Sequence, residues 1–218
     1  MTLPPDRLAA ELSPPGIIVT GGPIADWQGP FDPTEDAAVA AAGPRRRAEF
    51  IAGRMAARAA LARFGWPAVG LPRAADGPPV WPDGITGSIS HGAGWCLAAL
   101  CLTSTARAVG LDIEARHPLS AELIAEVCSP AELGLLVTEP DIGLAALRIF
   151  SAKEAAYKAQ FMLSRASFGF DGIAVTLRPD GGFVATLMQD AGPIVAGTAW
   201  PGRQAAMGDL LISALVIA

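Results

Sequence analysis

The chain lacks most of the groups that mark a specialised class of protein. Only 17% of its 218 residues are charged and 51% are hydrophobic, which excludes intrinsic disorder and a fibrous or coiled-coil design. It has three cysteines and no C-x-x-C pair, so no disulfide framework is expected. Cys96 and Cys101 lie five residues apart in a strand-like run and point to opposite faces. We expect buried free thiols.

Long apolar runs and a surplus of positive charge are also missing. The longest apolar runs, such as residues 210–218, are far shorter than the roughly 20 residues that span a bilayer. Residues 1–12 lack the basic and then apolar pattern of a secretory signal. The net charge of −5 excludes a broad affinity for nucleic acid or anionic membranes. We expect a soluble, cytoplasmic protein with any anion site confined to a local patch.

Helix and strand patterns alternate along the chain. A helix is predicted over residues 44–64, with Pro44 at its start and Gly65 after its end. Proline interrupts a helical pattern over residues 118–147, and a second helix is predicted over residues 151–162. Strands are predicted over residues 85–91, 95–103, 107–114, 173–177, 183–188, 194–200 and 210–217.

The order of these elements repeats, because each half reads as a helix followed by antiparallel strands. The sequence therefore predicts an α+β fold of two pseudo-duplicated α/β lobes, each a helix packed on a mainly antiparallel sheet. The divide near Ala106 gives an N-terminal lobe over residues 1–106 and a C-terminal lobe over residues 107–218.

The first predicted helix is unusually basic. It contains six of the chain's 16 basic residues, namely Arg45, Arg46, Arg47, Arg54, Arg58 and Arg63. Such a run forms either a solvated helix face or an anion site.

Two carboxylates alternate with apolar residues in the strand predicted over residues 107–114. Asp112 and Glu114 project from the same face of that strand. They form either an ordinary polar strand face or part of a Mg²⁺ site, because Mg²⁺ takes carboxylate oxygens together with substrate phosphates.

The residues at the start of the second predicted helix can be interpreted in two ways, as structural or as functional. Ser151 and Glu154 fit a helix capping box, and Glu154 with Lys158 fits a surface pair four residues apart. However, Lys153 and Lys158 are the only two lysines of the chain, which favours a role that needs a compact ammonium group.

Gly87-Ser88-Ile89-Ser90-His91 places one of two histidines at the mouth of the predicted hairpin. A serine hydrolase site is not indicated, because neighbouring strand residues face opposite ways and no G-x-S-x-G elbow is present. His91 is either a satisfied surface histidine or a phosphate ligand.

In their order and spacing, these motifs resemble the 4′-phosphopantetheinyl transferases of the Sfp-like class, in the branch of enterobactin synthase component D. The resemblance covers most of the chain. The residues that carry it are 45–50 with Gly53-Arg54 and Arg58, 81–84 leading into 87–91, 110–114, and 150–155 with Lys158.

The resemblance implies a monomer that binds coenzyme A between two pseudo-twofold lobes. It implies phosphate-binding roles for Arg46, Arg54, Arg73, Ser90, His91, Lys153 and Lys158. It implies Asp112, Glu114 and Glu154 as ligands of a Mg²⁺ cofactor, and Asp112, Glu154 and Lys158 as the catalytic group.

The implied reaction is attack by a serine hydroxyl of an apo acyl or peptidyl carrier protein on the pantetheine-side phosphorus of coenzyme A. Adenosine 3′,5′-bisphosphate leaves, with Lys158 neutralising its charge. Glu154 is the first candidate for the general base and a metal-bound water the second.

The sequence departs from the family pattern at two positions. Ile113 stands between the carboxylates and cannot bind a metal, so water is expected to complete that part of the shell. Gly92 replaces a cysteine found in many relatives, and we expect this change to be harmless. Residues 118–147 correspond to the variable part near the carrier-docking surface, where Leu123, Ile124 and Val127 form either a docking patch or part of the core.

Two other functions use the same residues. One is a Mg²⁺-dependent phosphohydrolase acting on coenzyme A or a nucleotide, and the other is an inactive module that binds coenzyme A or carrier proteins. Siderophore or other nonribosomal peptide, polyketide and fatty-acid synthesis are all open as the pathway served.

Overall fold

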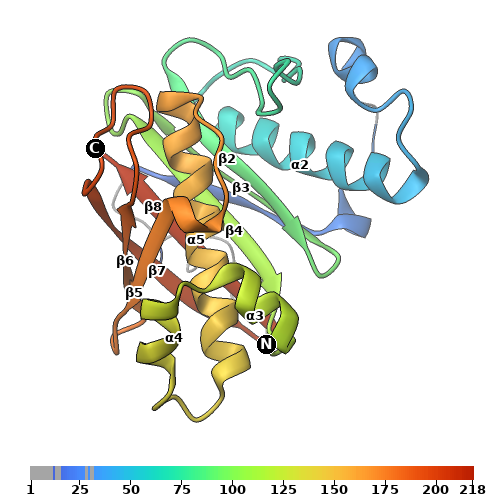
Figure 1. Cartoon of the computed structure of the whole chain (residues 1–218). Coiled ribbons are helices and arrows are strands. Elements are labelled where there is room, and N and C mark those ends of the chain that lie inside the picture. Colours follow the sequence, from blue (N-terminus) through green and yellow to red (C-terminus); the bar gives the residue numbers. More distant parts are fainter. Residues whose placement is uncertain (1–11, 13–15, 28, 30–31) are drawn as a thin grey trace.

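Two antiparallel sheets organise the chain, one in each half (Figure 1). The computed structural model describes residues 12, 16–27, 29 and 32–218. The first sheet has the order β1-β3-β2, formed by Ile18–Pro23, Trp95–Leu102 and Ile85–Gly92. The second has the order β4-β8-β7-β6-β5, formed by Ala108–Ala115, Leu210–Ile217, Ala199–Met207, Gly182–Leu187 and Ile173–Leu177.

One long helix covers each sheet. Helix α2, Pro44–Arg63, packs buried alanines and Leu61 against β3 and β2, and helix α5, Ile142–Ser164, packs a second row of alanines against the five-stranded sheet. Small side chains let a helix approach a sheet closely, so both helices sit tightly. The predicted fold class is confirmed. Among the described residues, no helix combines the length and apolarity needed to cross a membrane.

The other faces of the two sheets pack against each other. Leu97 and Cys101 of β3 share a core with Leu111 of β4 and Ile212 of β8. The two lobes are therefore joined by a common core, and the divide near Ala106 lies in the turn between β3 and β4. The division of the chain into two domains, residues 1–106 and 107–218, stays a prediction.

The cysteines behave as the strand alternation predicts. Cys96 faces the core under α2, whereas Cys101 faces the core between the sheets. Both are buried free thiols, and burial raises the pKa of each thiol to about 11. They have no reactive thiolate at neutral pH.

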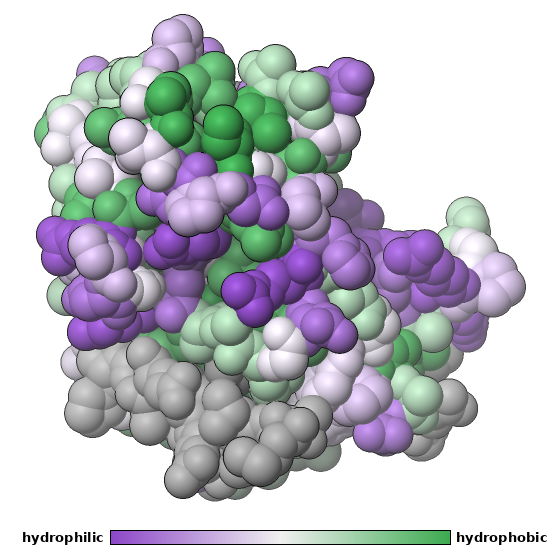
Figure 2. Space-filling model, turned by 90° about the horizontal axis from the view of Figure 1, so that it is seen from below, coloured by the Kyte–Doolittle hydropathy of each residue, from purple (hydrophilic) through white to green (hydrophobic). Residues whose placement is uncertain are grey.

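The interrupted region forms two short helices beside the first turns of α5, α3 over Ala121–Val127 and α4 over Pro130–Leu136. Three 3-10 helices complete the described part of the fold, η1 over Ile24–Asp26, η2 over Pro33–Ala38 and η3 over Phe170–Gly172. Of the docking patch considered above, Leu123 is 45% exposed while Val127 is 2% exposed. Figure 2 views this end of the molecule, where hydrophobic surface adjoins a hydrophilic band.

The start of the second long helix corrects the sequence prediction. Helix α5 begins at Ile142, not near Ser151, and Asp141 caps it by accepting a hydrogen bond from the Leu144 amide at 2.9 Å. Ser151 lies in the helix interior, fully buried, with its Oγ 2.7 Å from the Oγ of Ser213 on β8. The capping-box reading of Ser151 and Glu154 is therefore wrong.

The seventh strand also differs from its prediction. It covers Ala199–Met207 rather than residues 194–200. Residues 191–194 form a turn in place of a strand, with two backbone hydrogen bonds between Ala191 and Ile194. Proline has no backbone N–H to donate within a sheet. Pro201 does not interrupt the hydrogen bonds between β7 and β8, because these two strands pair only from Gly202 onward.

Candidate active site

The two lobes meet where β2 lies beside β4 (Figure 1). A Cβ added to Gly92 of β2 would lie 2.2 Å from the carbonyl oxygen of Ile113 on β4. In this backbone a Cβ at position 92 would clash with β4, so glycine is what allows this close approach, and the expectation that the change from cysteine is harmless stays a prediction. The Oγ of Ser88 accepts a hydrogen bond from the Leu111 amide at 3.1 Å. This close seam brings the polar side chains of the two strands together.

Lys158 connects the lobes at the seam. Helix α5 lies so near β4 that a Cβ on Gly110 would sit 1.8 Å from the carbonyl oxygen of Ala155. The Nζ of Lys158 lies 2.6 Å from Oδ1 of Asp112 and 3.1 Å from Oγ of Ser90. Ser90 also donates to Oδ1 of Asp112 at 3.1 Å. Three predicted site residues thus form one hydrogen-bonded cluster.

Three carboxylates surround this single ammonium group. Oε2 of Glu154 lies 3.9 Å from Nζ of Lys158. Burial, then the charge of Asp112, raises the pKa of Glu114 to about 7, and burial also raises the pKa of Glu154. Oδ2 of Asp112 is buried without a hydrogen-bond partner among the described residues. The cluster therefore holds more negative charge than one lysine neutralises.

These carboxylates have the donor chemistry of a Mg²⁺ site. They offer hard oxygens, and one of those oxygens is buried and unpaired. In the described part of the chain, no three His, Cys, Asp or Glu side chains are gathered as a ready metal-binding group. Lys158 instead contacts Asp112, which gives that carboxylate a cation from the protein itself.

A second polar cluster surrounds His91, the residue that follows Ser90 on β2. Nε2 of His91 lies 2.5 Å from Nη1 of Arg46, and Oε2 of Glu49 lies 3.5 Å from the same guanidinium nitrogen. Burial lowers the pKa of His91, and Arg46 lowers it further. The imidazole is therefore neutral at pH 7, so its Nε2 accepts the hydrogen bond from Arg46.

The basic helix divides into solvated and buried arginines. The side chain of Arg45 is 93% exposed, as the solvated-face reading requires. Arg54 is only 5% exposed. It donates from Nε to the carbonyl oxygen of Leu71 at 2.6 Å and lies over the ring of Phe50. Burial lowers its pKa to about 10, so the guanidinium keeps its charge at neutral pH.

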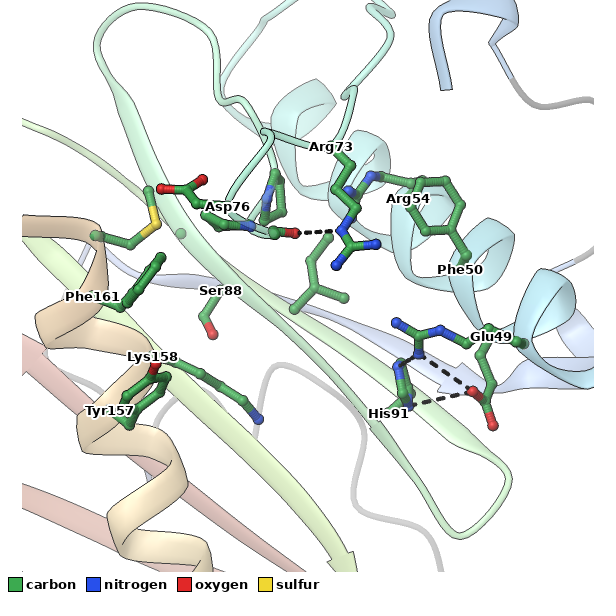
Figure 3. Close-up of a pocket in the computed structure, with 17 residues that line it drawn as sticks. Glu49, Phe50, Arg54, Arg73, Asp76, Ser88, His91, Tyr157, Lys158 and Phe161 are labelled. Carbon is green, nitrogen blue, oxygen red and sulfur yellow. Dashed lines mark hydrogen bonds and ion pairs between the residues drawn. The ribbon is translucent and has the colours of Figure 1, made fainter. Parts of the chain in front are cut away.

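A cavity of about 310 Å³ connects these groups across the lobes. Figure 3 shows Arg54, Arg73 and His91 on one side and Tyr157, Lys158 and Phe161 of α5 on the other. The segment that carries Arg73 turns back on itself, with Nε of Arg73 donating to the carbonyl oxygen of Gly77 at 3.2 Å. The predicted residues that line the cavity are Arg46, Arg54, Arg73, His91 and Lys158.

Two aromatic rings that were not predicted from the sequence form one wall of this cavity. Tyr157 and Phe161 line it from α5 and stack with ring centroids 5.7 Å apart. Tyr157 is the only tyrosine of the chain and directly precedes Lys158. The spacing of four residues between the two rings was a signal for a shared helix face.

Lys153 does not join the other predicted site residues. It is 2% exposed, and its Nζ donates to the carbonyl oxygens of Val127 and Phe170 and to Oε2 of Glu132, at 2.8 to 2.9 Å. All three ammonium hydrogens are therefore used inside the lobe. The predicted phosphate contact is not supported at this position, because no donor is left for it.

Comparison with known proteins agrees with the order of these motifs. Residues 34–101 match the family profile of the 4′-phosphopantetheinyl transferase N-terminal domain. Residues 108–203 match that of the 4′-phosphopantetheinyl transferase superfamily. The two matches meet between β3 and β4, where the two sheets of the structure separate.

Curated relatives cover most of the chain. The 4′-phosphopantetheinyl transferase Svp of Streptomyces mobaraensis is 37% identical over 193 residues, covering 85% of this chain and 78% of Svp. The 4′-phosphopantetheinyl transferase PptT of Mycobacterium tuberculosis is 34% identical, covering 85% of both chains. Enterobactin synthase component D of Escherichia coli K12 is 38% identical over 58% of this chain and 61% of its own. With its cation-lined cavity and carboxylate cluster, the chain belongs to the 4′-phosphopantetheinyl transferase superfamily of enzymes.

Proposed function

We propose that the cavity between α2 and α5 is where this enzyme carries out the family's reaction. It transfers the 4′-phosphopantetheine group of coenzyme A to a serine of an apo acyl or peptidyl carrier protein and releases adenosine 3′,5′-bisphosphate. One observation carries the assignment to this cavity. A cation-lined space of about 310 Å³ ends at the ammonium of Lys158, which is 2.6 Å from Asp112.

Coenzyme A carries three phosphates, and the cavity offers a matching group of cations. Arg54 and Arg73 line it from the N-terminal lobe, and Arg46 lies with His91 near its mouth. Arginine suits this task because its planar fork binds phosphate oxygens in pairs. Ser90 is proposed to bind the phosphates beside Lys158, whose ammonium donates to its Oγ at 3.1 Å.

Asp112, Glu114 and Glu154 are the residues that would hold Mg²⁺. The unpaired Oδ2 of Asp112 and the raised pKa values of both glutamates support this assignment. When bound, the ion supplies positive charge that neutralises the phosphate oxygens during transfer. Lys158 pairs with Asp112 beside these carboxylates.

The protein groups provide the proton transfer and the remaining charge. Glu154 is our candidate for the base that takes the proton of the carrier serine, because its carboxylate lies at the seam, 3.9 Å from the ammonium of Lys158. Lys158 neutralises the charge that grows on the departing adenosine 3′,5′-bisphosphate. All these groups come from one chain, so the proposed active unit is a monomer.

The test is to incubate the purified protein with apo carriers of peptide, polyketide and fatty-acid synthases, coenzyme A and Mg²⁺. The intact mass of each carrier is recorded with and without a chelator. A phosphopantetheine mass gain that needs Mg²⁺ supports the proposal and ranks the carriers. Cleavage of coenzyme A without any gain supports the phosphohydrolase, and binding without cleavage supports the inactive module.

A further inference from the structure

A buried ion pair lies behind the catalytic face of α5. Nζ of Lys153 is 2.8 Å from Oε2 of Glu132, and the two residues are 2% and 3% exposed. Glu132 also accepts hydrogen bonds from the amides of Ser129 and Val175, each at 2.7 Å. Every polar atom of the pair has a partner, so this buried pair carries no unsatisfied group.

The pair joins four segments to α5. Lys153 donates hydrogen bonds to the carbonyl oxygen of Val127 at the end of α3 and to that of Phe170 in η3. Glu132 caps the first turn of α4 through Ser129 and accepts a hydrogen bond from Val175 in the middle of β5. Among the described residues, no other side-chain hydrogen bond joins α3 or α4 to residues 168–175.

The joined segments form a wall beside Glu154. A separate cavity of about 150 Å³ opens there, lined by Glu154 and Lys153 and by the rings of Tyr157, Phe168 and Phe170. Lys153 directly precedes Glu154, so the pair fixes this wall one residue away from the proposed base.

The larger cavity is independent of this wall. None of its lining residues belongs to segments 127–136 or 168–175, and only Tyr157 lines both cavities. A change in the position of the wall should therefore alter what reaches Glu154 from outside while sparing the cationic binding surface.

A buried ion pair adds little to the stability of a fold, because the cost of desolvating both charges opposes their attraction. In some proteins such a pair instead selects one arrangement of the segments that it joins. We infer that Glu132 and Lys153 are positioning residues that hold segments 127–132 and 168–173 around Glu154 and so govern productive approach of the carrier serine. Neither residue contacts the phosphates of coenzyme A. The inference rests on the proposed transferase function.

The test compares Lys153→Met, Glu132→Gln and the double variant with the parent enzyme. We expect kcat/KM for the carrier to fall about 10- to 100-fold in each single variant, because small misplacements have such effects. The Kd of coenzyme A, measured calorimetrically without carrier, should change less than about twofold. The loss in the double variant should be smaller than the product of the single losses, since the two residues act through one pair.

Hydrogen exchange gives a readout that does not depend on activity. Amides of residues 168–175 should exchange faster in each single variant, whereas Glu139→Gln, on an exposed connection, should leave exchange and kinetics unchanged. If a single variant does not fold, the double variant carries the test, because it leaves no unpaired buried charge.

Two results would overturn the inference. In the first, Lys153→Met weakens coenzyme A binding while Glu132→Gln does not, which returns Lys153 to a phosphate-binding role. In the second, both variants keep parental carrier kinetics. A parent enzyme that modifies no carrier counts against the proposed function instead, and the exchange experiment still tests the pair.

Discussion

The three-stranded lobe and the five-stranded lobe contribute different chemistry to the cavity between them. Helix α2 and the segment after it supply arginines, while α5 and β4 supply carboxylates and one lysine. The repeated helix-on-sheet arrangement thus serves two tasks, binding of a polyanion in one lobe and group transfer in the other. Duplication of a fold has not meant duplication of its chemistry, and variants of the two lobes should affect different measurements.

The largest effect is expected from Asp112→Asn in the five-stranded lobe. The variant keeps the side-chain volume but removes the charge that pairs with Lys158 and that we assign to Mg²⁺. Turnover should fall at least about 10²- to 10³-fold, as for loss of one preorganised charge-stabilising group. The rate of holo-carrier formation measures it, with the exposed Asp209→Asn as control. Full turnover of Asp112→Asn at low Mg²⁺ would falsify the metal assignment.

Arg54→Ala should separate binding from turnover in the three-stranded lobe. Loss of a buried, charge-assisted phosphate contact is expected to raise the Kd of coenzyme A about 10- to 100-fold. The kcat should change much less. The matched control is Arg45→Ala on the same helix, whose side chain is 93% exposed. Equal effects of both substitutions would return Arg54 to a general electrostatic role.

Gly92→Ala tests the seam between the lobes. The new Cβ would lie 2.2 Å from a backbone oxygen of β4, so β2 and β4 must separate at a cost of about 1–3 kcal/mol. Thermal unfolding measures the loss. Gly134→Ala in α4 is the control, because its Cβ meets no atom within 4 Å and should stabilise the helix by about 0.5–1 kcal/mol. An unchanged melting temperature for Gly92→Ala contradicts the close seam.

His91 predicts a smaller, pH-dependent effect. Burial and Arg46 lower its pKa below the ordinary value of 6.5, so the unfolded state binds the proton first. Stability therefore falls as pH drops from about 6.5 to the lower folded-state pKa. His91→Gln should remove that part of the slope, measured by denaturant unfolding at several pH values. If the unfolding free energy of His91→Gln depends on pH as that of the parent does, other groups control this pH dependence.

The smallest effect is expected from Arg165→Ala. Its guanidinium lies 3.3 Å from a carboxylate oxygen of Asp76, joining the end of α5 to the loop of the other lobe. Both side chains are nearly half exposed, so the pair contributes about 0–1 kcal/mol. The KM for coenzyme A should rise less than about threefold. A larger rise means that this pair controls access to the cavity.

Much of the fold and site followed from local patterns. Alternation of apolar residues located the hairpin of β2 and β3 and placed Asp112 and Glu114 on one strand face. The helix start at Ile142 did not follow, because Ser151 and Glu154 imitate a capping box. Ser151 lies inside the helix instead, and its hydroxyl contacts Ser213, a partner 62 residues away in the sequence that local patterns do not reveal.

The two lysines show where sequence reasoning about the site succeeded and failed. Glu154 and Lys158 are four residues apart and share a helix face, as found. Lys153 lies five residues before Lys158, which turns it roughly 140° away around the helix at about 3.6 residues per turn. That geometry separates the two lysines, but identifying Glu132 as the partner of Lys153 required the tertiary structure.

The different burial of the two lysines also affects how the enzyme can be handled. Lys153 is 2% exposed, whereas the side chain of Lys158 is 27% exposed. Among the side chains of this chain, an amine-reactive dye, crosslinker or biosensor surface therefore meets a single accessible target. Because that target is Lys158, coupling through side-chain amines should inactivate the enzyme, and saturating coenzyme A should protect it.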